Sequence, residues 1–276
     1  MAVFAITPQE EPERDYRRDP SLKLSLLLIQ RGSYPYKDYW ALPGGFARPG
    51  ESTPFSAFRE LQEETSIRDA YLRPFGIFSD TGRDPRGWII SHGFLALVNA
   101  KDYQLRAGAD AWDARWFSIR LTDDEAQKKV TGTNARITKT YHLELENVLL
   151  ERTLRADIRE TRVFEQHHER IDYEILRSDG IAFDHASIIL QAFLQLRLLA
   201  ETEGKIVFDL MPEKFTLNML QEAQEIILGK ELLTPNFRRK MAPLVKETEE
   251  FASRAGHRPA RLFVRNLEAF YQDTQM

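Results

Sequence analysis

The alternation of hydrophobic and polar residues predicts strands in the first part of the chain. Residues 22–30 form a nearly continuous apolar run, which is typical of a central strand buried on both faces. Residues 72–79 and 89–98 have the composition of two further strands on either side of the loop 80–87. Residues 7–20 are rich in Pro, Glu, Arg and Asp, so we expect residues 1–20 to form a flexible leader.

A helix is predicted between these strands. Ser52 or Thr53 can cap its first turn, and Pro54 is well suited to the position that follows. The predicted buried face, at helical spacing, consists of Phe55, Phe58 and Leu61. A second helix is expected to begin at the acidic cluster 123–125, which would cap it.

The middle of the chain alternates again. Residues 138–150 and 162–176 predict a β-hairpin inserted at about 131–180, which completes a first domain over residues 21–180. Residues 184–200 have an amphipathic pattern. We therefore expect a linking helix over 181–204, which either joins two domains or lies at a dimer interface.

The last part, residues 205–276, predicts a small winged helix-turn-helix domain. Residues 218–228 form a helix that ends at Gly229, a short turn covers 230–235, and a second helix begins near Asn236. Residues 256–264 read as the turn and strand of a wing. Residues 236–265 hold eight basic and three acidic side chains, a charge of +5.

Such a basic patch suits contacts with DNA phosphates. The candidate DNA-binding residues are Thr216, Asn236, Arg238, Arg239, Lys240, Arg258 and Arg261. The alternative is a small helical domain whose basic face is only solvated or binds a protein.

Composition limits the remaining possibilities. The length of 276 residues suits one or two domains, and 42% hydrophobic and 29% charged residues are typical of a soluble globular protein. The net charge of −4 gives no overall basic field, and the absence of cysteine excludes disulfides and thiolate chemistry. No apolar run is long enough to span a bilayer, so we expect a cytoplasmic protein with no membrane partner.

Three carboxylates on the first predicted helix are the main chemical signal. Glu60, Glu63 and Glu64 have the spacing that places them on one side of a helix, where their repulsion favours a bound cation. Oxygen ligands suit Mg²⁺ or Mn²⁺ and a substrate phosphate. The alternative is an ordinary solvated acidic helix face.

The spacing around these carboxylates resembles the Nudix box. Gly45 is followed by five residues, Glu51, seven residues, and then the run Arg-Glu-Leu-Gln-Glu-Glu at 59–64; the one departure is Ser66, where the box has glycine. The resemblance implies an α+β fold, a Nudix α/β/α sandwich with a mixed sheet. It also implies a metal site formed by Glu60, Glu63, Glu64 and Gly45, with Arg59 orienting the carboxylates.

Other residues are candidates for catalysis or substrate binding. Nudix proteins carry an acidic residue before a Trp-Phe strand, which makes Asp110 or Asp113 the candidate general base. Arg83 and Arg86 could bind a diphosphate or could pair locally with an aspartate. The predicted substrate-binding residues are Glu51, Arg83, Arg86 and Tyr36, the last either stacking on a base or packing within its loop.

Residues 21–117 and 184–264 together resemble the Nudix-related regulators of NAD metabolism (NrtR type). The similarity is strongest in the loop 80–87 with Ser91 and in the segments 208–216 and 236–240. It implies an ADP-ribose-responsive repressor, often a homodimer, that binds double-stranded DNA.

The two resemblances give different expectations for catalysis. Because every charged box residue is present, we expect a Mg-dependent Nudix pyrophosphatase that converts ADP-ribose-like nucleotides to AMP and ribose 5-phosphate, fused to a DNA-binding winged helix. One alternative is an ADP-ribose-sensing repressor with little or no hydrolysis. Another is an enzyme whose C-terminal part only dimerises.

Overall fold

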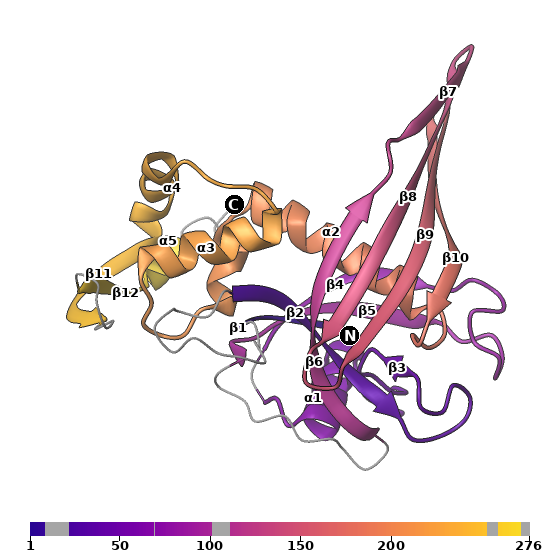
Figure 1. The fold of residues 1–276 in the computed structure, drawn as a ribbon, viewed down its shortest axis with the longest axis horizontal. Coiled ribbons are helices and arrows are strands. Elements are labelled where there is room, and N and C mark those ends of the chain that lie inside the picture. The colour runs from indigo at the N-terminus through magenta and orange to yellow at the C-terminus, as the bar shows by residue number, and fades with distance from the viewer. Residues whose placement is uncertain (9–21, 69, 101–110, 253–258, 272–276) are drawn as a thin grey trace.

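The computed structural model describes residues 1–8, 22–68, 70–100, 111–252 and 259–271. A large mixed sheet with helices on both faces forms the main body, and a small helical part with a two-stranded sheet lies at one end (Figure 1). This arrangement confirms the predicted α+β class.

Ten strands form the large sheet within the described part of the chain, in the order β10-β9-β8-β6-β2-β1-β5-β4, with β3 (Trp40–Ala41) and β7 attached to β2 and β8. The apolar run of the sequence becomes β2 (Leu22–Arg31), which is central and buried as predicted. It pairs antiparallel with β6 (Ala111–Asp123) on one side and with β1 (Ala2–Pro8) on the other.

The strand β1 corrects the expectation of a flexible leader. Residues 2–5 are fully buried, and β1 is also parallel to β5 (Ser91–Leu97), which in turn pairs with the edge strand β4 (Tyr71–Phe78). One partner, β2, is the next strand along the chain, but the other, β5, is distant in sequence, so the short apolar run at 2–6 does not by itself reveal its burial. Residues 9–20 lie outside the described residues.

Two apolar cores cover the two faces of the sheet. Val3, Leu27 and Ala96 face α1 (Thr53–Thr65), while the alternating positions Phe4 and Leu26 belong to the core under α2. Helices on both faces of a mixed sheet constitute the predicted α/β/α sandwich.

Helix α1 presents a different face to the core than its phenylalanines suggest. Phe55 is 61% exposed and Phe58 38%, so their predicted burial is wrong. The buried side chains of α1 are Ser56, Ala57, Leu61 and Thr65. Ser56 and Ala57 are small, so the helix can lie close to the sheet.

The ends of α1 are well defined by their caps. The Ser52 hydroxyl accepts a hydrogen bond from the Phe55 amide, and Ser66 ends the helix with φ 66°, in the left-handed region. Serine therefore replaces the box glycine in the strained conformation itself, at a modest energetic cost.

The inserted hairpin is larger than predicted. It is a meander of β8 (Asn134–Asn147), β9 (Arg152–Glu165) and β10 (His168–Asp179), with β7 (Gln127–Thr131) beside β8, and it projects well beyond the body (Figure 1). Asp123 ends β6, so the expected helix at 123–125 is absent and this prediction is wrong. Asp123 instead pairs with Lys139, and Asp124 with His142, so these acidic side chains contact β8 and do not cap a helix.

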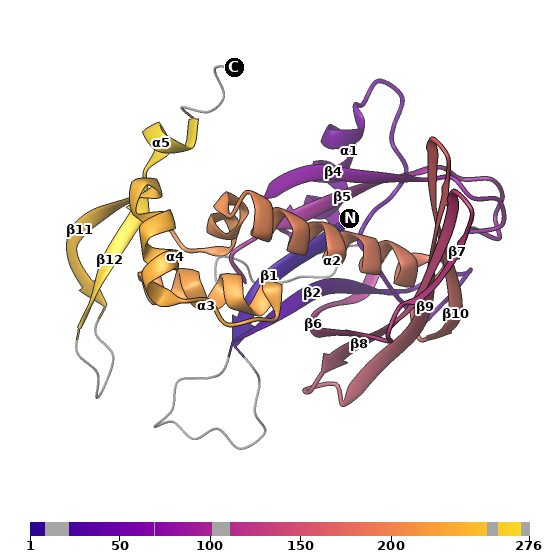
Figure 2. The ribbon, with the colours of Figure 1, turned by 90° about the horizontal axis from the view of Figure 1, so that it is seen from above.

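Helix α2 (His185–Thr202) connects the two parts of the molecule (Figure 2). Near its end, Arg197 Nε donates to the Ile227 carbonyl at 3.1 Å and the Ala200 carbonyl accepts from Gln224 at 2.9 Å. The small part consists of α3 (Leu217–Leu228), α4 (Thr234–Met241), β11 (Val245–Ala252), β12 (Ala260–Arg265) and α5 (Leu267–Tyr271). In the described residues, no helix is long and apolar enough to cross a membrane.

Candidate functional site

A cavity of about 1020 Å³ opens between α1, the loop at 43–49, the loop at 83–91 and the start of α2. Four carboxylates of the described residues line it: Glu60 and Glu64 from α1, Asp84 from the loop, and Asp184 from the cap of α2. The same wall carries Arg31, Arg83 and Arg86. The cavity therefore brings acidic and basic groups from distant parts of the chain together.

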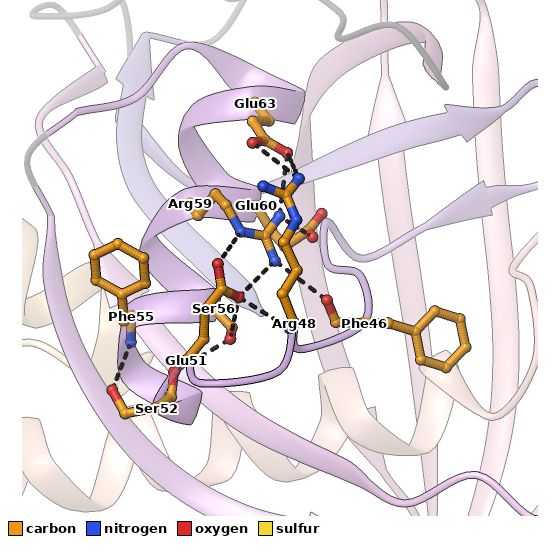
Figure 3. Close-up of polar contacts among 9 residues, drawn as sticks. All are labelled: Phe46, Arg48, Glu51, Ser52, Phe55, Ser56, Arg59, Glu60 and Glu63. Atoms are coloured by element: carbon orange, nitrogen blue, oxygen red, sulfur yellow. Dashed lines mark hydrogen bonds and ion pairs between the residues drawn. The ribbon is translucent and has the colours of Figure 1, made fainter.

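Arg59 organises the acidic side of α1 (Figure 3). Its Nε and Nη2 donate to the two carboxylate oxygens of Glu51 at 2.8 and 3.0 Å, and its Nη1 donates to Glu60 and Glu63 at 2.5 and 3.1 Å. The side chain is only 10% exposed. One guanidinium thus fixes three carboxylates, which is the orienting role that the box resemblance implied.

Glu51 is a structural partner of Arg59 and does not line the cavity. Its carboxylate also accepts from the Ser56 hydroxyl at 2.9 Å and from the Arg48 amide at 3.0 Å. These bonds, that of Arg59 foremost, lower the pKa of Glu51 to about 2. In the structure this carboxylate therefore binds Arg59 and does not face the cavity, where the predicted substrate contact would be made.

Glu60 and Glu64 both face the cavity next to the glycine pair. A Cβ on Gly45 would lie within 2.6 Å of both Glu60 carboxylate oxygens, and Glu64 accepts from the Gly44 amide at 2.7 Å. Mg²⁺ is commonly held by one or two carboxylates together with water and phosphate oxygens, so this oxygen-rich pocket fits such an ion.

The expected set of three carboxylate ligands is not gathered. Glu63 is directed toward Arg48 and Arg59 and is 49% exposed. In the part of the chain that the structure describes, no three histidine or acidic side chains approach closely enough to hold a metal by themselves. Although Glu63 is only three residues after Glu60, its side chain is oriented by its bonds to Arg48 and Arg59.

The candidate general base Asp113 is not brought to the cavity. Asp113 lies on β6, accepts from the Ala114 amide and pairs with Arg115 at 2.9 Å. It is not among the residues that line the cavity. Asp110 lies outside the described residues.

Both predicted phosphate-binding arginines lie on the cavity wall, and both are paired. Arg83 contacts the Asp184 carboxylate through Nε and Nη2 at 2.8 and 3.0 Å, and its Nη1 donates to the Ser91 hydroxyl at 2.8 Å. Arg86 contacts Asp84 through Nε and Nη2 at 3.0 and 2.6 Å. The local Arg–Asp pair that the sequence left open is present for Arg86, whereas Arg83 pairs with an aspartate 101 positions further along the chain.

Three residues that line the cavity, Arg31, Phe183 and His185, gave no clear signal in the sequence. His185 Nδ1 accepts from the Leu42 amide at 2.9 Å, and burial lowers the pKa of His185 to about 3, so the ring is neutral. The Phe183 ring lies between Tyr36, at 4.7 Å, and the guanidinium of Arg31, at 4.8 Å. Phe183 has φ 53°, an unusual value for a bulky residue, and Tyr36 in contact with it has φ 59°.

Tyr36 packs beside the cavity without lining it. Its ring contacts Phe183 and Tyr39, while the nearby Trp40 is buried against Phe117 at 4.8 Å. The packing interpretation therefore describes these aromatic residues better than base stacking.

The C-terminal part has the exposed basic helix expected of a helix-turn-helix. Asn236, Arg238, Arg239 and Lys240 are exposed on α4, and Arg261 of β12 pairs with Glu247. Thr216 is different: it is 6% exposed, and its hydroxyl accepts from the Met219 amide as the cap of α3, so it is not available to DNA. Arg258 lies outside the described residues.

Comparisons with known proteins agree with this division. A family model described as NUDIX domain matches residues 16–141, and one described as NrtR DNA-binding winged helix domain matches residues 207–264. Fold, cavity and C-terminal part thus define a protein in which a Nudix domain is joined to a winged helix.

Individual relatives narrow this class. The ADPR responsive transcriptional repressor NtrR of Acinetobacter baylyi is 33% identical over 245 residues, which cover 87% of this chain and 75% of that protein. The ADP-ribose pyrophosphatase of Methanocaldococcus jannaschii is 39% identical over 94 residues, 34% of this chain and 54% of that protein. The chain therefore belongs to the NrtR family of Nudix-related transcriptional regulators.

Solved structures show the same fold over nearly the whole chain. A MutT/nudix family protein of Enterococcus faecalis covers 96% of this chain and 85% of its own, with a TM-score of 0.61 and 26% identity. Shewanella oneidensis NrtR, complexed with a 27mer DNA, covers 98% and 94% with a TM-score of 0.61 at 23% identity.

Proposed function

We propose that this protein is an ADP-ribose-responsive transcriptional regulator, in which nucleotide binding to the Nudix cavity alters DNA binding by the winged helix. The observation that carries this proposal is the course of α2. Asp184 and His185 at its start line the cavity, and Arg197 and Ala200 near its end bond to α3. One continuous helix therefore contacts both the nucleotide site and the DNA-binding part.

The named relatives support the choice of ligand and output. The Acinetobacter baylyi protein is an ADPR responsive repressor, and the Methanocaldococcus jannaschii protein acts on ADP-ribose. A cavity of about 1020 Å³ also lies at the upper end of the volumes usual for small-molecule sites. ADP-ribose, an extended dinucleotide-like molecule, is of suitable size.

The ligand diphosphate binds at the glycine pair, beside Glu60 and Glu64. A Mg²⁺ or Mn²⁺ ion held there by these two carboxylates would neutralise the diphosphate and acidify a bound water. Arg59 keeps Glu60 in place, and the Gly44 amide holds Glu64. Gly45 leaves the space that the Glu60 carboxylate occupies.

Hydrolysis of the bound nucleotide is the second candidate function, favoured by the same two cavity-facing carboxylates. Cleavage of ADP-ribose by water gives AMP and ribose 5-phosphate. Since Asp113 is paired with Arg115 away from the cavity, Glu60 or Glu64 is the better proton acceptor for the attacking water.

A homodimer is the form that we expect to bind DNA, because two winged helices related by a twofold axis would match a palindromic operator. Sedimentation velocity of the purified protein at micromolar concentration tests this, and a monomer with full operator affinity would contradict it.

Two measurements separate regulation from turnover. Fluorescence anisotropy of a labelled duplex, from the region upstream of an NAD-biosynthesis gene, should show binding that ADP-ribose weakens. DNA binding that is indifferent to ADP-ribose would remove the regulatory proposal.

Phosphorus NMR of ADP-ribose with Mg²⁺ and protein then tests hydrolysis. If Glu64 holds the metal, Glu64→Gln should abolish two new phosphomonoester signals, a loss of more than about a hundredfold. Glu63→Gln is the matched control, because Glu63 lies outside the cavity. A persistent diphosphate signal in the wild type would leave binding alone as the function of the site.

A further inference from the structure

We propose that Arg31 is the phosphate-binding arginine of the cavity, and that Arg83 and Arg86 instead hold the cavity wall. The identity of the ligand as a nucleotide rests on the proposed function. The assignment itself rests on how the guanidinium groups of Arg31, Arg83 and Arg86 are paired; the fourth arginine that lines the cavity, Arg48, pairs with Glu63.

Arg83 has almost no hydrogen-bonding capacity left for a ligand. Two of its N–H groups bind Asp184, and Nη1 donates to the Ile89 carbonyl at 3.1 Å and to the Ser91 hydroxyl. Four of the five donors of a guanidinium are thus used. A phosphate could reach this arginine only by displacing Asp184, the residue that precedes α2.

Arg86 is also committed to a carboxylate. It forms a bidentate pair with Asp84, whose side chain is buried and which also accepts from the Arg86 amide at 2.9 Å. Removing Asp84 from this pair would leave a buried charge without its partner, which is costly. The pair therefore closes the tight turn at 84–87.

Arg31 is differently placed. It ends the central strand β2, and its Nε donates to the Pro35 carbonyl at 2.9 Å. Among the residues that the structure describes, no carboxylate forms an ion pair with it, although it lines the cavity. Within the described residues, no hydrogen bond engages the terminal amino groups of Arg31, so they are available to an anion without displacing a carboxylate.

The surroundings of Arg31 favour an anionic ligand. Its guanidinium lies 4.8 Å from the Phe183 ring centroid, and that of Arg86 lies 5.4 Å from the same ring. Burial, followed by the nearby charge of Arg86, lowers the pKa of Arg31, and the charges of Asp84 and Glu64 offset this only in part. A phosphate beside Arg31 would offset it further.

The charges of this wall agree with a single phosphate contact. The charge of Arg83 is balanced by that of Asp184, the charge of Arg86 is balanced by that of Asp84, and His185 is neutral. Arg31 supplies the surplus positive charge. The ring of Phe183, a residue constrained at φ 53°, packs against the Arg31 guanidinium.

The test is calorimetric titration of ADP-ribose, AMP and adenosine into wild type, Arg31→Met, Arg31→Lys and Arg86→Met. Loss of a charged hydrogen-bonding partner should weaken ADP-ribose and AMP binding by about tenfold to a hundredfold in Arg31→Met. Adenosine, which has no phosphate, should bind this variant as it binds the wild type. Arg31→Lys should lie between them, because an ammonium keeps the charge without the fork.

Arg152→Met, on the projecting meander, is the surface control, and equal melting temperatures would show that Arg31→Met folds. The proposal is overturned if Arg31→Met binds ADP-ribose like the wild type, if adenosine loses as much affinity, or if Arg86→Met has the larger effect. If wild type does not bind ADP-ribose, the proposed function fails first. Titration of inorganic pyrophosphate with Mg²⁺ then decides: binding that depends on Arg31 supports the subsite, and its absence overturns it.

Discussion

The Glu60 carboxylate lies so close to Gly45 that it leaves no room for a side chain at position 45. A Cβ atom on Gly45 would lie 2.4 Å from Glu60 Oε2. Gly45 does not have a positive φ, so its backbone conformation alone would accept another residue. The missing side chain of Gly45 therefore serves the carboxylate: it leaves room for Glu60 at the cavity, while Arg59 binds the same carboxylate.

Gly45→Ala is expected to displace the Glu60 carboxylate with little loss of stability, because the clash is with the end of a flexible side chain. The melting temperature should change little, by an amount equivalent to less than about 1 kcal/mol. Binding of Mn²⁺, followed by electron paramagnetic resonance, should weaken at least about tenfold. Combining Gly45→Ala with Glu60→Asp shortens the acid and should relieve the clash without restoring the metal site. Unchanged Mn²⁺ affinity in Gly45→Ala would remove Glu60 from the proposed ligands.

Asp184→Asn should destabilise the fold through Arg83. The Arg83 side chain is almost fully buried, and its bidentate partner lies at the cap of α2. Leaving this charge without its carboxylate should lower the free energy of unfolding by about 2–4 kcal/mol, measured by urea denaturation.

Asp179→Asn provides the comparison for that variant. Asp179 pairs with Arg177 on β10, where both side chains are at least half exposed, so its loss should cost no more than about 0.5 kcal/mol. Equal effects of the two substitutions would show that the pair at α2 contributes no more than an ordinary surface pair.

The sequence was sufficient for the features that are local in the chain. The spacing from Gly45 to Glu64 identified α1 and its charged side chains, and the apolar run at 22–30 identified the central strand. Helix α3 and its end at Gly229 followed from the same kind of signal, since a left-handed residue after an amphipathic segment is a local stop.

Features that depend on distant pairing were not predictable in this way. Strand β1 is buried because β2 and β5 flank it, and Asp184 matters because Arg83, a hundred and one positions earlier, reaches it. Phe55 and Phe58 have the spacing of a core face, but the close approach of α1 to the sheet selects Ser56 and Ala57 instead. Arg31 became a candidate only from the structure, in which Arg83 and Arg86 form ion pairs with aspartates and Arg31 does not.

The stability of the protein should decrease on acidification partly through His185. Burial lowers the pKa of this imidazole to about 3, so the folded protein keeps it neutral while the unfolded chain takes up a proton below its usual value of 6.5. The free energy of unfolding therefore falls as the pH is lowered from about 6.5 toward 3. In His185→Gln, which can still accept from the Leu42 amide, urea midpoints between about pH 7 and pH 5 should change less than in the wild type.

His142 provides a contrast of opposite sign. Its bonds to Asp157 and then Asp124 raise its pKa, so the folded protein binds this proton more tightly and gains stability as the pH falls. His142→Gln should consequently lose stability more steeply on acidification than the wild type. Parallel curves for all three proteins would show that neither imidazole contributes.

The exposed basic residues of α4 should control how DNA affinity depends on salt. Arg239 is exposed, and the hydrogen bond found for it within the described residues is the one that it donates to Asn236 of its own helix at 3.2 Å. If it binds a phosphate, Arg239→Ala should weaken binding to a labelled mixed-sequence duplex and reduce the slope of log affinity against log salt by about one. Arg177 lies on β10, at the far side of the molecule from α4 (Figure 1), so Arg177→Ala should leave the slope unchanged. A slope that is the same in Arg239→Ala and wild type would place the DNA contact on another surface of the winged helix.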